Sequence, residues 1–216
     1  MKPRFDMGKI DWSVYAIIDK VWLGERSIQK VAEQIILGGA GVIQYRDKKS
    51  ESGDFFADAY ILSQVTRKHG IPLIINDRVD IAMAVGADGV HLGQEDLPVD
   101  VARKIVGDGM ILGGSVHSLS EFEQMKEADY FGVGAVYTTS TKEGVPVRGI
   151  ELIRQIRALT TKPIVGIGGI TAENLSPVIE AGADGVAVIS AILGAENVEK
   201  ATLRIKEMFQ RIEWMK

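Results

Sequence analysis

One local pattern, repeated four times along the chain, constrains the fold more than any other feature. A stretch with helical periodicity ends in Gly-Ala or Ala-Asp, and a short apolar run follows it. The copies are GGAGVIQ (Gly38–Gln44), GADGVHLG (Gly86–Gly93), ADYFGVG (Ala128–Gly134) and GADGVAVIS (Gly182–Ser190). Glycine permits the left-handed turn that ends a helix, and a short β-rich apolar run is typical of a buried parallel strand. The pattern therefore predicts repeated helix–strand units.

Four more apolar runs and a set of amphipathic stretches complete the alternation. The further strands are predicted at Val14–Ile18, Pro72–Ile75, Met110–Gly113 and Pro163–Gly166. The predicted helices include Ser27–Leu37, Asp54–Lys68, Ser120–Glu127, Gly149–Leu159, Glu173–Glu180 and Ala201–Lys216. Strict alternation predicts a parallel sheet. Eight units in 216 residues favour closure into a barrel.

The predicted fold class is therefore α/β, a single (β/α)8 TIM barrel. We expect residues 13–216 to form this one domain and residues 1–12 to be an N-terminal extension, either a cap or a short helix. A doubly wound open sheet is the alternative. It is less favoured because the segment after the first predicted strand reads IIDKVWLGE (Ile17–Glu25) and lacks the G-x-G-x-x-G turn of dinucleotide-binding sheets.

Composition and charge exclude several classes of function. A net charge of −4 without a basic stripe argues against nucleic-acid partners. The absence of an apolar run of about 20 residues argues against a membrane span, and the polar N-terminus is unlike a signal peptide. The chain has no cysteine, which excludes thiolate chemistry and disulfides. We expect a cytoplasmic protein that acts on small molecules. A homo-oligomer is possible, and the sequence does not decide the oligomeric state.

Polar residues crowd the predicted carboxyl ends of the strands, where barrel enzymes carry their active sites. Glycine-rich turns at Gly166–Ile170 and Ile189–Ala191 precede helices, so their backbone N–H groups predict phosphate binding. The alternative is that these glycines only permit tight turns. The hydroxyl-rich run Thr139, Ser140, Thr141 followed by Lys142 predicts a second phosphate contact, and its alternative is a solvated turn.

Two aspartates indicate a metal site. Asp77 and Asp96 follow adjacent predicted strands, so their carboxylates can converge. Mg²⁺ usually takes one or two carboxylates together with water and phosphate oxygens. The cations Arg46, Lys48 and Lys142 would repel one another unless a diphosphate lay between them. The alternative is that Asp77 caps a helix and that Asp96 is a cap or turn residue.

These segments together resemble the thiamine phosphate synthase family, which is related to the thiazole tautomerases. The motifs that carry the resemblance are QYRDK (Gln44–Lys48), INDRVDIA (Ile75–Ala82), GADGVHLGQEDLP (Gly86–Pro98), TTSTK (Thr138–Lys142), IVGIGGIT (Ile164–Thr171) and GADGVAVISAI (Gly182–Ile192). The resemblance covers nearly all of the chain after about residue 13. It implies a Mg²⁺-dependent transferase that joins 4-amino-2-methyl-5-hydroxymethylpyrimidine diphosphate to thiazole phosphate, with dissociative C–O cleavage and release of pyrophosphate.

The resemblance also implies roles for particular residues. Arg46, Lys48 and Lys142 would be catalytic, and Asp77 and Asp96 would bind Mg²⁺. The pyrimidine diphosphate would be bound by Gln44, Tyr45, Arg46, Asp47, Lys48, Asn76, Ser115 and Lys142, with the Tyr45 side chain directed away from the ligand. The thiazole phosphate would be bound by Thr139, Ser140, Thr141, Gly169, Ile189 and Ser190.

Two other functions compete with this one. In a thiazole tautomerase, His117 in the segment Ser115–Leu119 would act as a base. The favoured alternative is a partly buried histidine bonded near a strand end. A catalytically silent barrel that binds thiamine precursors and regulates is the third possibility. A tautomerase would not need Arg46, Lys48 and both aspartates together. Loss of one of these four would support the silent barrel, and this chain has all four.

Overall fold

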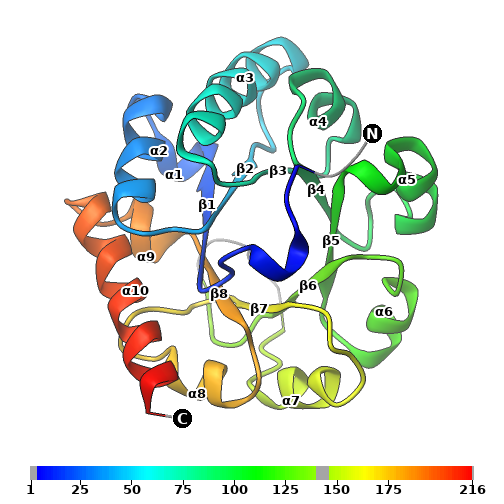
Figure 1. Ribbon diagram of the computed structural model, residues 1–216, viewed down its shortest axis with the longest axis vertical. Helices are drawn as coiled ribbons and strands as arrows, with labels where there is room; N and C mark the ends of the chain where they lie inside the picture. Colours follow the sequence, from blue (N-terminus) through cyan, green and yellow to red (C-terminus); the bar gives the residue numbers. More distant parts are fainter. Residues whose placement is uncertain (1–3, 140–145, 216) are drawn as a thin grey trace.

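Eight parallel strands close into a barrel in the order of the sequence, and helices surround it (Figure 1). The computed structural model describes residues 4–139 and 146–215. The strands are β1 Val14–Asp19, β2 Val42–Arg46, β3 Leu73–Asn76, β4 Gly89–Leu92, β5 Ile111–Val116, β6 Tyr130–Gly134, β7 Ile164–Ile167 and β8 Gly185–Val188. Pairing of β1 with β8 closes the sheet. The predicted (β/α)8 barrel is confirmed.

Each predicted helix is present. The α-helices are α1 Lys20–Leu23, α2 Ile28–Leu37, α3 Ser52–His69, α4 Val79–Val85, α5 Val99–Val106, α6 Leu119–Gln124, α7 Glu151–Arg157, α8 Ser176–Glu180, α9 Ser190–Leu193 and α10 Val198–Trp214, and the short 3-10 helices are η1 Met7–Lys9 and η2 Gly107–Gly109. Within the described parts of the chain, no helix combines the length and the apolar character needed to cross a membrane.

Some helix boundaries differ from the sequence prediction because side-chain caps decide them. Helix α10 begins at Val198, three residues earlier than expected, since the Asn197 side chain accepts a hydrogen bond of 2.9 Å from the Lys200 N–H. Helix α1 was not predicted. The Asp19 carboxylate caps this four-residue helix by accepting hydrogen bonds from the Val21 and Trp22 N–H groups.

The strands are apolar on both faces because each face meets a different core. One core cluster lies inside the barrel and includes Tyr15, Ile17, Ile74 and Val165. A larger cluster joins the outward side chains of the strands to the surrounding helices. Side chains alternate between these two environments along each strand. This alternation explains why the strands appear in the sequence as continuous apolar runs.

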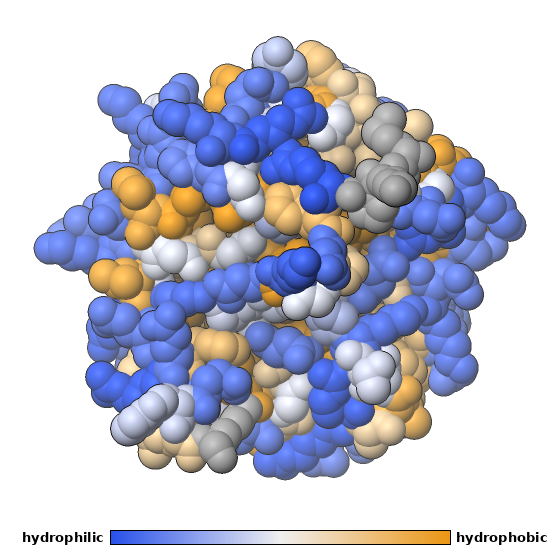
Figure 2. Space-filling view, in the orientation of Figure 1, coloured by the Kyte–Doolittle hydropathy of each residue, from blue (hydrophilic) through white to orange (hydrophobic). Residues whose placement is uncertain are grey.

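The N-terminal segment lies across one end of the barrel, as the dark blue ribbon in Figure 1 shows. Trp12 is buried there, with its ring centroid 4.8 Å from that of Tyr130 inside the barrel. A side chain at Gly41 or Gly185 would collide with the backbone of this segment. Polar residues cover most of the same face in the space-filling view (Figure 2). The segment thus covers the apolar interior at this end.

We expect Trp12→Ala to lower the free energy of unfolding by about 3–5 kcal/mol, because it removes a large buried ring and leaves a cavity. Trp214→Ala is the matched control, since Trp214 is 90% exposed whereas Trp12 is 6% exposed. The control should change stability by less than about 0.5 kcal/mol. Urea denaturation measures both values. Equal effects of the two substitutions would contradict a closing role for the N-terminal segment.

Candidate active site

A cavity of about 570 Å³ opens at the carboxyl ends of the strands. It brings together side chains that lie far apart in the sequence. The residues predicted from the sequence that line it are Gln44, Arg46, Lys48, Asn76, Asp77, Asp96, Ser115, Thr139, Gly169, Ile189 and Ser190. Three further predicted residues lie outside the described residues, so their roles stay predictions: Ser140, Thr141 and Lys142.

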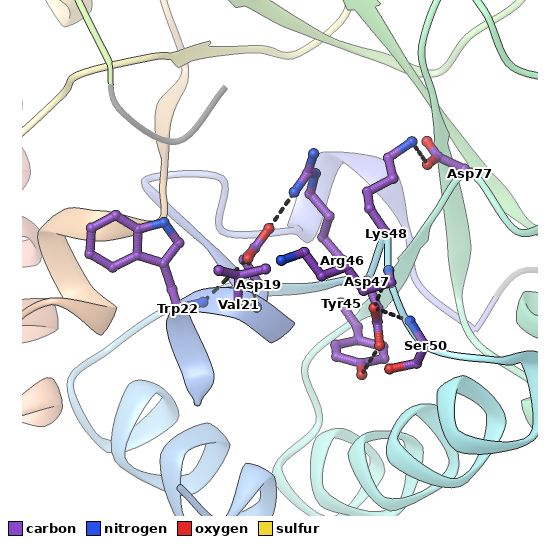
Figure 3. A network of polar contacts seen from close by, with 10 residues as sticks. Asp19, Val21, Trp22, Tyr45, Arg46, Asp47, Lys48, Ser50 and Asp77 are labelled. Atoms are coloured by element: carbon purple, nitrogen blue, oxygen red, sulfur yellow. Dashed lines mark hydrogen bonds and ion pairs between the residues drawn. The ribbon is translucent and has the colours of Figure 1, made fainter. Parts of the chain in front are cut away.

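The polar residues at the end of β2 point alternately to the cavity and to the surrounding helices. Arg46 and Lys48 face the cavity, whereas Tyr45 and Asp47 point toward α3 (Figure 3). The Tyr45 hydroxyl donates to Asp58 at 2.8 Å, and the Asp47 carboxylate accepts from the Lys49 N–H at 2.8 Å. Both residues were expected to bind the pyrimidine diphosphate. Strand alternation turns both side chains away from the cavity, as was expected of Tyr45 but not of Asp47. Their roles in binding stay predictions.

The two inward cations of this segment each pair with a carboxylate. Arg46 pairs with Asp19 from the end of β1, and Lys48 pairs with Asp77 from the end of β3 (Figure 3). Asp19 is 2% exposed, and sequence reasoning missed it. The signal was present in the sequence, since an aspartate that ends an apolar strand seldom lacks a partner when it is buried.

Asp77 and Asp96 converge, as the sequence predicted. Asp77 has a φ of 63°, which is uncommon for a residue other than glycine. Burial and the nearby Asp96 carboxylate raise the pKa of Asp77 to about 6, against the opposing effect of Lys48. Burial acts to raise the pKa of Asp96 as well, but hydrogen bonds with Asp77 and the Gly93 N–H hold it below its usual value. Two carboxyl groups that cannot both ionise at low energetic cost form a site that favours a cation.

The capping alternative differs between the two aspartates. Helix α4 begins after Arg78 without a side-chain cap, so Asp77 does not cap it. Asp96 accepts a hydrogen bond of 2.7 Å from the Gly93 N–H and so does stabilise a turn. Helix α5 follows Pro98, again without a side-chain cap. Asp96 thus combines a turn contact with its hydrogen bond to Asp77.

The arrangement fits Mg²⁺ better than a metal held by protein alone. In residues 4–139 and 146–215, no cluster of three or more acidic or histidine side chains could hold a metal ion. Mg²⁺ commonly uses one or two carboxylates and takes its other ligands from water and substrate phosphates. Asp77 and Asp96 supply that number of carboxylates, with Lys48 beside them for a phosphate oxygen.

The opposite part of the cavity has the predicted glycine turn. Gly168 and Gly169 have φ values of 99° and 66°, and a side chain at either would collide with the segment after β6. The Asn174 side chain holds the turn by donating to the Gly169 carbonyl at 2.9 Å and accepting from the Thr171 N–H at 2.8 Å. Arg148 also lines the cavity and was missed, since it lies in a loop without a strand-end pattern.

A chain of buried polar groups crosses the floor of the cavity. The Gln44 amide donates to the Tyr15 hydroxyl at 2.8 Å, which lies 2.6 Å from the Tyr130 hydroxyl. Tyr130 lies 2.9 Å from Nδ1 of His91, and Nε2 of His91 lies 2.9 Å from the Ser115 hydroxyl. The chain fixes Gln44 and Ser115 at two places on the wall. Sequence reasoning missed its three central members, although each is a polar residue in an apolar strand.

His117 is bonded near the end of β5, as its simpler interpretation predicted. Its Nδ1 lies 2.8 Å from the Glu121 carboxylate, and the same oxygen accepts from the His117 N–H at 2.8 Å. Both side chains line the cavity. The pairing orients the ring through Nδ1. In a general base of this kind, Nε2 would be the nitrogen that accepts the proton.

A barrel with a carboxylate pair, inward cations and a glycine turn at the end of β7 defines the class of (β/α)8 enzymes that act on small phosphorylated molecules. Comparison with known proteins gives the family. The profile described as thiamine monophosphate synthase matches residues 14–192, and the chain belongs to this family.

Individual relatives agree over nearly their full length. The thiamine-phosphate synthase of Clostridium botulinum is 43% identical over 94% of this chain and 97% of the relative. That of Persephonella marina is 41% identical over 94% and 99%. The structure of thiamine phosphate pyrophosphorylase from Pyrococcus furiosus superposes with a TM-score of 0.86 at 36% identity and covers 94% of this chain and 98% of its own. The chain is thus an enzyme of this family.

The buried His91 should make stability depend on pH. Burial lowers the pKa of its ring from 6.5 to about 4, so the unfolded chain binds a proton that the folded chain excludes. The contribution is complete above pH 6.5 and is lost as pH falls toward 4. At roughly 1.4 kcal/mol per pH unit, the free energy of unfolding should fall by about 3 kcal/mol from this group.

Urea denaturation between pH 7 and pH 4 measures this loss. His91→Gln, which cannot titrate, should be about 3 kcal/mol more stable at pH 4 than wild type, when both are referred to their stabilities at pH 7. His69→Gln removes an exposed histidine and is the control that should leave the slope unchanged. If His91→Gln and wild type lose stability in parallel, His91 is not the group that excludes the proton.

Proposed function

We propose that this enzyme condenses 4-amino-2-methyl-5-hydroxymethylpyrimidine diphosphate with thiazole phosphate and releases thiamine phosphate and pyrophosphate. The observation that carries the proposal is the convergence of Asp77, Asp96, Arg46 and Lys48 on one wall of the cavity. A diphosphate with its cation matches that set of charges. The names of the relatives that span nearly the whole chain support the same reaction.

The proposed mechanism is a dissociative cleavage. The pyrimidine C–O bond breaks, pyrophosphate departs with the bonding electrons, and the aminopyrimidine ring stabilises the methylene cation that remains. The thiazole nitrogen then captures this cation and forms the new C–N bond. Mg²⁺ bound at Asp77 and Asp96 would neutralise charge on the diphosphate. Arg46 and Lys48 offset the charge that grows on the departing oxygen, so the chain supplies electrostatic stabilisation and positioning.

The remaining parts of the cavity divide between the two substrates. The proposed pyrimidine would lie beside Gln44, Asn76 and Ser115. The hydrogen-bonded groups across the cavity floor hold Gln44 and Ser115 in place. Thr139, Gly169, Ile189 and Ser190 lie where the thiazole phosphate would bind. Ser140, Thr141 and the catalytic role of Lys142 remain predictions from the sequence. A cytoplasmic location and a homo-oligomer also remain predictions.

Thiazole tautomerisation is the second candidate, and the His117–Glu121 pair favours it. A tautomerase moves a proton on the thiazole ring and needs a base at hydrogen-bond distance. His117 lines the cavity with its orientation fixed by a carboxylate. The carboxylate pair beside Lys48 has no use in that reaction, which is why the condensation is the better supported function.

Asp77→Asn and Asp96→Asn should each reduce thiamine phosphate formation by more than about 100-fold, because each removes one of the two charged ligands proposed for Mg²⁺. The amide keeps the size of the side chain, so the fold should persist. Initial rates across a Mg²⁺ titration measure the effect, with circular dichroism as the check on folding. Full activity of either variant over the whole titration would remove that aspartate from the metal site.

The two candidate functions make opposite demands on His117. His117→Ala should keep condensation within about tenfold of wild type, since it loses at most a hydrogen bond or some packing worth about 1 kcal/mol. Arg46→Ala should lose about 100- to 1,000-fold, because its charge acts on the leaving group. Thiamine phosphate formation is measured for both, and thiazole tautomer exchange for wild type. Exchange without condensation, abolished by His117→Ala, would establish the tautomerase instead.

A further inference from the structure

We propose that Asp19 is a positioning residue that aims Arg46 at the departing pyrophosphate. The inference rests on the proposed function and assigns a role to a residue outside the predicted site. Asp19 and Arg46 are the last residues of adjacent parallel strands, and they are partners in the register of β1 with β2. Their side chains form an ion pair, and Arg46 lines the cavity in front of Asp19 (Figure 3).

The Asp19 carboxylate is itself held in place. One oxygen accepts hydrogen bonds from the backbone of α1, at 3.0 Å from the Val21 N–H and 3.4 Å from the Trp22 N–H. The other oxygen pairs with Arg46. Asp19 is 2% exposed, so its carboxylate is shielded from water. The carboxylate therefore transmits the fixed position of the barrel rim to the guanidinium group.

The two nearby lysines pair with other carboxylates and do not compete with Arg46 for Asp19. Lys20, the next residue, turns to the helix side of the strand and donates to Asp58 at 2.6 Å. Lys48 pairs with Asp77, which follows the neighbouring strand β3. An arginine side chain has many rotamers, and without Asp19 its guanidinium would occupy the productive position for a smaller fraction of the time.

The sign of the Asp19 charge separates positioning from binding. A buried carboxylate behind the cation repels a diphosphate, so it weakens the binding of the substrate in the ground state. Its benefit appears only if it holds Arg46 where charge develops in the transition state. Loss of the charge should therefore lower kcat and should not raise KM for the pyrimidine diphosphate. A loss of general structural integrity would not produce this division.

Asp19→Asn tests the role directly, because an asparagine oxygen can still cap α1 while its amide cannot pair with arginine. We expect kcat to fall about 10- to 100-fold with KM for the pyrimidine diphosphate unchanged or lower. Asp19→Ser, a second neutral capping residue, provides the same test if the asparagine variant does not fold. Asp58→Asn is the matched control, since it removes a carboxylate paired with Lys20 on the helix side of the same strands. It should keep the activity of wild type.

A double-mutant cycle decides whether Asp19 acts through Arg46. In the Arg46→Ala background, Asp19→Asn should cause no further loss of kcat, because the group that it positions is already absent. A kcat for Asp19→Asn equal to that of wild type would overturn the proposal, and so would an equal loss in both backgrounds. If neither wild type nor Asp58→Asn forms thiamine phosphate, the proposed function itself is wrong. If both are active and Asp19→Asn is equally active, only the role of Asp19 is wrong.

Discussion

Closure of the barrel is the constraint on which the rest of the structure depends. Once β8 pairs with β1, every strand has one face toward a shared interior and one toward the helices. The N-terminal segment covers one end of that interior with Trp12. Inward polar groups therefore have access to ligands at one end, where the carboxyl ends of the strands meet. The cavity contains residues from opposite sides of the barrel because the strands converge there on one opening, while Trp12 packs at the other end.

The same closure forces charged groups of like sign into proximity. Arg46 and Lys48 point to one cavity, and so do Asp77 and Asp96. Pairs between opposite charges relieve part of this repulsion, since Arg46 meets Asp19 and Lys48 meets Asp77. The pKa of Asp77 is nevertheless raised, first by burial and then by the nearby Asp96 carboxylate, and Lys48 compensates only part of this. In the proposed function, a diphosphate with a divalent cation would balance these charges.

The buried polar groups on the cavity floor hold their neighbours in place, whereas the residues at the rim supply the charges. Tyr15, Tyr130 and His91 bond to one another inside an apolar barrel, where an unpaired hydroxyl or ring nitrogen would be costly. Each bond fixes the next group along. Gln44 and Ser115, at the two ends of this chain, therefore face the cavity in defined orientations. Positioning of this kind suits a reaction in which the leaving group departs with little help from the nucleophile.

The sequence by itself determined the barrel, the edge that holds the site, and most of the residues on that edge. Glycine-ended helices followed by short apolar runs carry local information, and eight such units have few ways to bury their strands. The acidic pair was predictable because Asp77 and Asp96 follow neighbouring strands.

Only the tertiary structure decided that Asp47 turns away from the cavity. It lies on the helix side with Tyr45, whose direction was expected, because side chains alternate along β2 and the sequence of a polar strand end does not by itself give the phase of that alternation. The sequence could indicate that a buried Asp19 needs a partner, but not that the partner is Arg46, which lies 27 positions away and adjoins it through the register of two strands. Contacts of this kind exist only after the sheet has closed, because pairing across strands is a property of the fold and not of the local sequence.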